Sequence, residues 1–88
     1  MPSDIYDTVF HRISEFVSAN GGDTTYQQNG DNVSIVSRFT GAPDISFANS
    51  LFDTVKQIAP NAYTRLTLSP DRNDRSKLFI QIVANFRG

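Results

Sequence analysis

The chain has no cysteine and no tryptophan, and it has one histidine among its 88 residues. Without cysteine, neither a disulfide nor a thiolate metal site can form, although this absence does not fix the compartment. The single histidine, His11, leaves little for nucleophilic catalysis or a zinc site. We therefore expect no enzyme activity, no cofactor and no bound metal.

Long apolar runs are absent as well. No segment approaches the about 20 apolar residues of a membrane span. The N-terminus lacks the basic region and apolar run of a secretion signal, so we expect a cytoplasmic protein without membrane contact. Lysine and glutamate are normally common, but this chain has two lysines and one glutamate. That composition suggests a small viral or phage protein, which would act in the host cytoplasm.

The net charge of −1 does not suggest bulk attraction to nucleic acid or anionic lipid. The charge is unevenly distributed along the chain. Residues 1–60 carry seven acidic and three basic side chains, whereas residues 61–88 carry two acidic and five basic ones. The sequence contains neither G-x-x-x-x-G-K-[ST] nor G-x-G-x-x-G, the two glycine-rich phosphate-binding motifs, so no phosphate-binding loop is indicated.

The length predicts one small α+β domain over residues 1–88. Ser3 or Asp4 is expected to cap a first helix, and the segment 20–22, Asn-Gly-Gly, to end it. Its apolar stripe has helical spacing. The other face carries a line of polar residues that we interpret as solvated ion pairs, because ligands along one helix cannot surround a metal. The stripe is Ile5, Val9, Ile13, Phe16 and Val17, and the polar line is Asp7, His11 and Glu15.

A β-hairpin is expected next, with arms at residues 24–28 and 32–40 around Asn29-Gly30. In the second arm, the apolar row toward the core is interrupted by Ser37. The segment 41–43, Gly-Ala-Pro, is expected to break the strand.

A second helix is predicted to start at Asp44 or Ser46 and to end at Pro60. Its apolar positions again have helical spacing. They are Ala48, Leu51, Phe52, Val55, Ile58 and Ala59.

Two further strands are expected at residues 61–69 and 77–86, joined by a polar loop. The last strand is the most apolar run in the chain, with one wholly apolar face: Leu78, Ile80, Ile82, Ala84 and Phe86. The loop begins like a calcium loop at Asp71 but lacks the sixth-position glycine and the closing glutamate. A solvated connection is the favoured interpretation, with Arg72 and Arg75 as candidate contact residues.

The element order is α-β-β-α-β-β, so both halves have the same order of elements, which we interpret as a repeated architecture and not as evidence of a true duplication. Residues 36–39, Val-Ser-Arg-Phe, match residues 83–86, Val-Ala-Asn-Phe, at an offset of 47. We expect a four-stranded antiparallel sheet with both helices packed on one face. The order is a cyclic permutation of the ferredoxin-like β-α-β-β-α-β order, a resemblance that concerns topology and implies no function.

Strand alternation places one set of side chains on the sheet face away from the helices. We expect no carboxylate there, and we expect Phe79 and Val83 to lie in water because no helix covers this face. Exposed apolar patches usually mark a contact surface. The set is Val36, Arg38, Tyr63, Arg65, Lys77, Phe79, Gln81 and Val83.

Two functions fit this face. The favoured one is contact with protein, either a second copy or a host partner, through the face or through a sheet edge. The alternative is a nucleic-acid platform, with Tyr63 and Phe79 stacking bases while Arg38, Arg65 and Lys77 hold phosphates. The last strand lacks the glycine of the RNA-recognition signature, and the net charge is negative, so protein contact is favoured.

Overall fold

The structure is a computed structural model that describes residues 2–87, with side chains from Tyr6 onward. Two helices and four strands follow in the predicted order. They are α1 (Pro2–Ala19), β1 (Asp23–Asn29), β2 (Asn32–Ala42), α2 (Ile45–Ile58), β3 (Tyr63–Pro70) and β4 (Leu78–Arg87).

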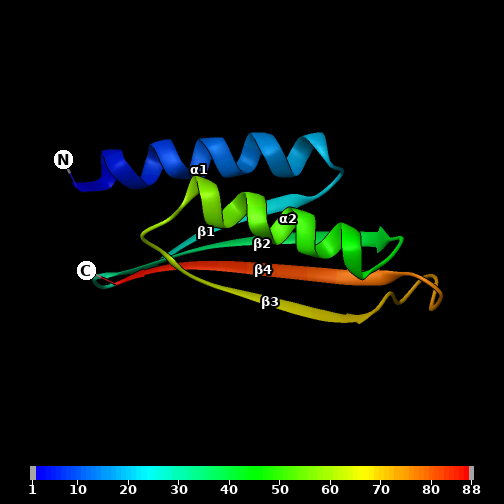
Figure 1. Cartoon of the computed structure of the whole chain (residues 1–88). Helices are drawn as coiled ribbons and strands as arrows, with labels where there is room; N and C mark the ends of the chain where they lie inside the picture. The colour runs from blue at the N-terminus through cyan, green and yellow to red at the C-terminus, as the bar shows by residue number, and fades with distance from the viewer. Residues whose placement is uncertain (1, 88) are drawn as a thin grey trace.

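The strands form one antiparallel sheet in the order β1-β2-β4-β3, and both helices lie on the same face of it (Figure 1). The predicted α+β fold is confirmed. Because β4 is antiparallel to both of its neighbours, β2 and β3 run in the same direction with β4 between them. The helix α2 therefore connects a split β-α-β unit. Neither helix in residues 2–87 has the length and apolarity needed to cross a membrane.

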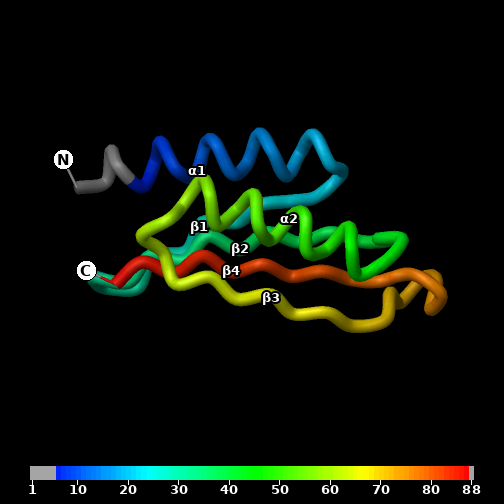
Figure 2. The backbone as a smooth tube through the Cα atoms, viewed as in Figure 1, coloured from blue at the N-terminus to red at the C-terminus, as the bar shows by residue number. Residues whose placement is uncertain are grey.

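The two halves of the chain are arranged symmetrically in the sheet. The order β1-β2-β4-β3 reads the same when the first hairpin and the second are exchanged. At its centre Val36 lies opposite Val83, 47 positions later, which is the offset of the sequence match. Figure 2 shows α1 and α2 crossing the sheet in opposite directions, as this symmetry requires. The second half has a much longer hairpin loop, between Pro70 and Leu78.

The core lies between the sheet and the two helices. Most of the predicted inward row of β4 is buried there, with Ile80 and Ile82 fully inaccessible, whereas Leu78 at its start is partly buried. Fully burying side chains of this kind contributes about 1.5–3 kcal/mol each before the entropy of folding is counted. Val33, Ile35 and Phe39 of β2 lie beside them on the same sheet face. The helices contribute Ile13 and Val17 of α1 and Ala48, Leu51 and Val55 of α2 to the same core.

The end of α1 and the start of α2 follow the sequence signals, whereas α1 begins ahead of its predicted caps Ser3 and Asp4. Asp44 caps α2 by accepting a hydrogen bond from the Phe47 N–H at 2.9 Å. Gly21, with φ of 81°, ends α1, and the Gly22 N–H donates to the Val17 carbonyl at 2.9 Å. The helix α1 already begins at Pro2, and the side chains of Ser3, Asp4 and Ile5 lie outside the described residues.

The first hairpin turns one residue later than predicted. Asn29 pairs with Asn32, so the two loop residues are Gly30 and Asp31. Gly30 has φ of 64°, and no described residue other than glycine has positive φ. A glycine at the first loop position is typical of a type II′ turn, whereas the predicted Asn-Gly turn needs positive φ at both positions.

The strand β2 continues to Ala42, past the predicted break. A register shift between Phe39 and Ala42 marks a bulge, and Gly41 within it has φ of 68°. Glycine supplies that conformation without a steric penalty, so it bends the strand and does not end it. The bulge brings the Gly41 N–H to the loop between β3 and β4, where the Asp71 carboxylate accepts its hydrogen bond.

Candidate binding surface

The sheet face away from the helices is uncovered by any other element of residues 2–87 (Figure 1). We call it the open face. The pairing register defines its cross-strand rows. The central row is Thr25, Val36, Val83 and Arg65, and the next row toward the first hairpin turn is Gln27, Ser34, Asn85 and Tyr63.

Seven of the eight residues predicted for this surface share the open face. Lys77 does not belong to its strands, because β4 begins at Leu78. Hydrogen bonds of its own backbone hold Lys77 in the loop, with its N–H donating to the Asp74 carbonyl at 2.9 Å. The seven are Val36, Arg38, Tyr63, Arg65, Phe79, Gln81 and Val83.

The apolar side chains of the open face are less exposed than predicted. Val36 is only 6% exposed, because a short side chain on a central strand lies among larger neighbours on both sides. Phe79 and Val83 are half-buried. Tyr63 is 73% exposed, so its ring offers the largest accessible aromatic surface of this face. The open face is therefore a polar surface with one exposed ring, and the predicted apolar patch is wrong.

One carboxylate reaches this face, contrary to the prediction. Asp23, the first residue of β1, lies opposite Arg38. The sequence prediction began the strand at Thr24 and so left Asp23 outside the sheet. Arg87 at the end of β4 adds a third arginine to Arg38 and Arg65. The open face thus carries three arginines and one aspartate among the described residues.

Charge is segregated between the two layers. The helices, with the Asp44 cap, have five acidic and two basic residues, giving −3. The sheet and its connections have four acidic and six basic residues, giving +2. These sum to the net −1 of the chain. The small net charge therefore conceals a basic sheet layer: Arg38, Arg65, Arg72, Arg75, Lys77 and Arg87 against Asp23, Asp31, Asp71 and Asp74.

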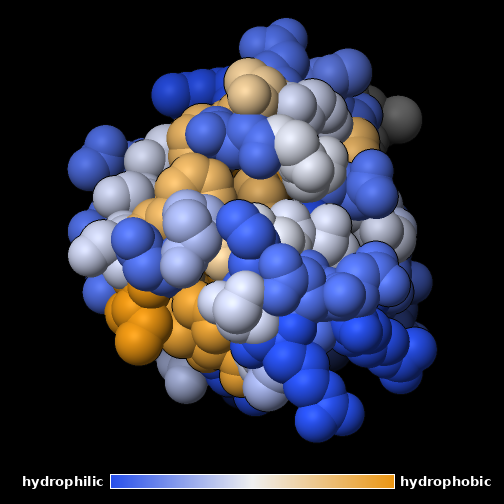
Figure 3. Space-filling model, turned by 90° about the vertical axis from the view of Figure 1, so that its right-hand side faces the viewer, coloured by the Kyte–Doolittle hydropathy of each residue, from blue (hydrophilic) through white to orange (hydrophobic). Residues whose placement is uncertain are grey.

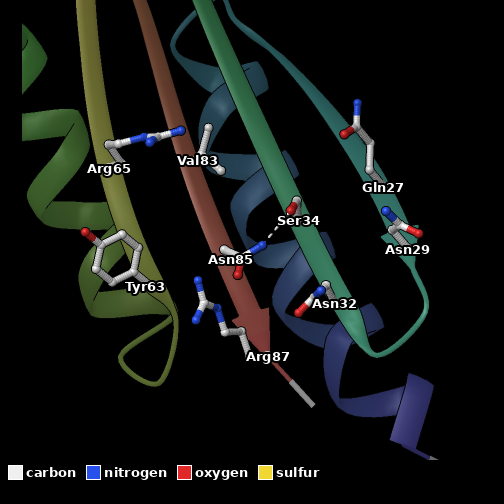
Figure 4. A pocket seen from close by; sticks show the side chains of 9 residues that line it. All are labelled: Gln27, Asn29, Asn32, Ser34, Tyr63, Arg65, Val83, Asn85 and Arg87. Carbon is white, nitrogen blue, oxygen red and sulfur yellow. Dashed lines mark hydrogen bonds between the residues drawn. The ribbon is translucent and has the colours of Figure 1, made fainter.

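A hollow of about 620 Å³ lies on the open face, near the first hairpin turn and the end of β4 (Figure 4). Two arginines, a tyrosine, a serine and four amide side chains surround a single apolar residue, Val83. The Asn85 side-chain amide donates to the Ser34 hydroxyl at 2.7 Å, which fixes both groups. The lining residues are Gln27, Asn29, Asn32, Ser34, Tyr63, Arg65, Val83, Asn85 and Arg87.

A second hollow, of about 520 Å³, lies at the opposite end of the face. Phe79 and Arg72 line it together with the start of the β3–β4 loop. The loop explains why Phe79 is half-buried. Figure 3 views this end of the molecule, where hydrophilic side chains dominate and hydrophobic ones show between them, mainly in the left half of the view. Ile45 at the start of α2 is 59% exposed.

The β3–β4 loop is more than a solvated connection. Asp71 is 5% exposed, and its carboxylate accepts from the backbone N–H groups of Gly41 and Asn73. Asp74 accepts from both the backbone N–H and the hydroxyl of Ser76, which holds the pKa of Asp74 below its usual range. Arg72 and Arg75 are exposed on this fixed loop.

Sequence reasoning missed most of the first hollow. Arg87 lies beyond the predicted end of the last strand, and the prediction assigned no role to the amides of β1 and β2. Their alternation was nevertheless visible: Gln27 and Asn29 share a face, as do Asn32 and Ser34. A search for clustered amides on the outward positions would have found them.

Comparison of the chain with protein-family models, with curated proteins and with solved structures gave no match. The described residues contain no group of three or more His, Cys, Asp and Glu side chains that would hold a metal ion. The function must therefore be argued from the open face itself.

Proposed function

We propose that this protein is a non-catalytic interaction module that binds a protein partner through its open face. The observation that carries the proposal is the composition of this uncovered face. Among the described residues it bears three arginines and the exposed Tyr63, and it bears no lysine or glutamate. Interface cores are enriched in arginine and tyrosine and depleted in lysine and glutamate.

The energetics of such a contact differ from those expected from the sequence. Because Val36 is buried and Phe79 and Val83 are half-buried, little apolar area remains to be removed from water. Charge-assisted hydrogen bonds from the arginines, about 1.5–3 kcal/mol each, must supply much of the binding free energy. Binding should consequently weaken as salt is raised.

The partner is either a different protein or a second copy of this chain. The composition favours a viral or phage accessory protein whose partner is a host protein in the cytoplasm. For a second copy, the test is the mass in solution by sedimentation equilibrium, with Tyr63→Asp as the variant. Tyr63 suits this test because its exposed ring can be replaced without disturbing the core. A monomeric unmodified chain would leave only a different protein as partner.

One observation favours nucleic acid as a second candidate: the exposed Tyr63 ring lies beside two arginines. The other predicted stacking ring, Phe79, is remote from Tyr63. Tyr63 lies opposite Asn85, and Phe79 and Asn85 are separated by about 20 Å along β4 at about 3.4 Å per residue. Titration of single-stranded RNA and DNA over a salt series tests this candidate. Phosphate contacts must appear first at low salt, so no binding there removes it.

The proposal is tested by comparing three forms of the protein as bait in extracts of its source or host. The forms are the unmodified chain, Arg65→Glu on the open face, and Arg12→Glu on the exposed side of α1. Both substitutions change the charge by the same amount. We expect Arg65→Glu to lose the partner and Arg12→Glu to retain it. Equal retention by both variants would refute the role of the open face.

A further inference from the structure

We infer that the hollow beside the first hairpin turn binds an extended, acidic segment of the partner, with carboxylates held by Arg65 and Arg87. This inference rests on the proposed protein-binding function and adds the chemistry of the ligand. It depends on the charge, the spacing and the hydrogen-bonding groups of the lining residues.

The charge of the hollow is positive and unbalanced. Among the described residues that line it, Arg65 and Arg87 alone carry a charge at neutral pH, and none is Asp or Glu. Among the described residues neither guanidinium has an ion-pair or hydrogen-bond partner. A guanidinium binds a carboxylate through two parallel hydrogen bonds, which gives both attraction and orientation. Two arginines without internal partners are therefore suited to carboxylates from outside.

The spacing of the two arginines fits an extended chain. Arg65 lies opposite Val83, and Arg87 follows Val83 by four residues on β4. Four residues of strand span about 13 Å of backbone, so the backbone positions of the two arginines are about as far apart along the strands as residues i and i+4 of an extended ligand. Figure 4 shows Arg65 reaching over β4 toward Val83 and Arg87 reaching toward Tyr63, so both head groups lie over the hollow.

The amides around the arginines match a peptide better than a sugar-phosphate backbone. Gln27, Asn29 and Asn32 each offer a donor and an acceptor in the same side chain. A peptide backbone presents N–H and carbonyl groups in alternation, so both halves of an amide find partners. Phosphate oxygens only accept hydrogen bonds, so along a sugar-phosphate backbone the amide carbonyls would find donors only at the ribose 2′-hydroxyls of RNA.

The exposed ring of Tyr63 completes the site at the β3 side. It shares a row with Asn85, whose amide is already directed by its bond to Ser34. The rigid Tyr63 ring and the hydrogen-bonded Asn85 offer contact area while losing little side-chain conformational entropy on binding, as tyrosine does in binding surfaces generally. The lining residues that the structure describes include no second ring and no lysine. Stacking of successive bases, which single-strand binders use, therefore has one ring only.

The probe for the test is a labelled ten-residue peptide that alternates serine and aspartate, compared with the same peptide carrying asparagine for aspartate. Fluorescence anisotropy with the full chain should show binding of the aspartate peptide, weakening with salt, and at least tenfold weaker binding of the asparagine peptide. We expect Arg65→Gln and Arg87→Gln each to weaken binding about tenfold. Arg65→Lys should restore only part of it, because lysine cannot bond in the bidentate manner.

A matched control keeps the result interpretable. Arg12→Gln removes an exposed arginine from α1, away from the open face, so this variant should bind like the unmodified chain. Equal binding of the two peptides, or equal loss in the control, would overturn the inference. Tighter binding of a ten-nucleotide single-stranded RNA than of the aspartate peptide would also overturn it and would identify a nucleic-acid site.

Failure of this inference and failure of the proposed function give different results. If the aspartate peptide does not bind but Arg65→Glu still abolishes partner capture, the open face binds protein through other chemistry. If the Arg65→Glu variant captures as much partner as the unmodified chain, the proposed function itself is refuted. Nuclear magnetic resonance shift mapping with the peptide adds a readout independent of affinity, since the shifts should centre on Asn85 and spare Phe79.

Discussion

The Asp71 carboxylate accepts a hydrogen bond from the Gly41 backbone N–H, joining the β3–β4 loop to the bulge of β2 across 30 positions of sequence. Its other oxygen accepts from the Asn73 N–H at 2.8 Å. A carboxylate that is 5% exposed and satisfied by two amides belongs to the folded framework. This link forms one wall of the second hollow and fixes the loop that carries Arg72.

Asp71→Ala should lower the free energy of unfolding by about 2–3 kcal/mol, because two backbone N–H groups lose a charged acceptor. Asp71→Asn should cost less, since one acceptor oxygen remains. Urea denaturation measures both, with Asp53→Ala on the exposed side of α2 as the control. A cost for Asp71→Ala no larger than for the control would contradict the structural role.

Gly22 should tolerate no side chain. A Cβ there would lie 2.6 Å from the Phe39 ring and 2.7 Å from the Arg38 carbonyl oxygen. We expect Gly22→Ala to cost about 3 kcal/mol by overpacking. Gly21→Ala is the matched control, because its Cβ meets open space and it pays only the positive-φ penalty of about 1 kcal/mol. Thermal unfolding compares the two, and an equal loss would show that the close approach is absent.

Ser37 and Thr24 face each other across β1 and β2, and both hydroxyls are buried without a hydrogen-bond partner among the described residues. Removing an unpaired buried hydroxyl should be stabilising. Ser37→Ala and Thr24→Val should each raise the free energy of unfolding by about 1 kcal/mol. A destabilisation in urea denaturation would indicate that the two hydroxyls are hydrogen-bonded in solution.

The pKa of Asp74 is lowered from 3.8, first by the Ser76 hydroxyl and then by the Ser76 backbone N–H, with a smaller contribution from Lys77. A lowered folded pKa means that the ionised carboxylate stabilises the folded loop. That contribution is complete above pH 3.8 and is lost as the pH falls through the lowered value. Ser76→Ala should raise the pKa of Asp74 in a carboxyl NMR titration. An unchanged value would contradict the hydrogen bond as its cause.

Some of these features were predictable from the sequence and others were not. The core row of β4 follows from strict alternation, and the Asp44 cap follows from its position ahead of an apolar stripe. Local pattern also put the arginines at positions 38 and 65 and the ring at position 63 on one face. The exposure of each side chain did not follow, because Val36 is covered by neighbours on other strands and Phe79 by a loop.

Strand ends caused the remaining errors at the site. Asp23, Lys77 and Arg87 each lie within one residue of a strand boundary, where pairing with the neighbouring strand decides whether a residue joins the sheet. Asp71 was unpredictable for a related reason. Asp71 accepts a hydrogen bond from the Gly41 N–H, and only the tertiary structure brings the bulge at Gly41 next to this loop.

The most direct test of the open face as a binding surface is quantitative partner capture by the unmodified chain, Arg65→Glu and Arg12→Glu, all first shown to be equally stable in urea. We predict that the partner retained by the unmodified chain is lost with Arg65→Glu and kept with Arg12→Glu. Loss with Arg12→Glu and retention with Arg65→Glu would place the partner on the helices and contradict the account.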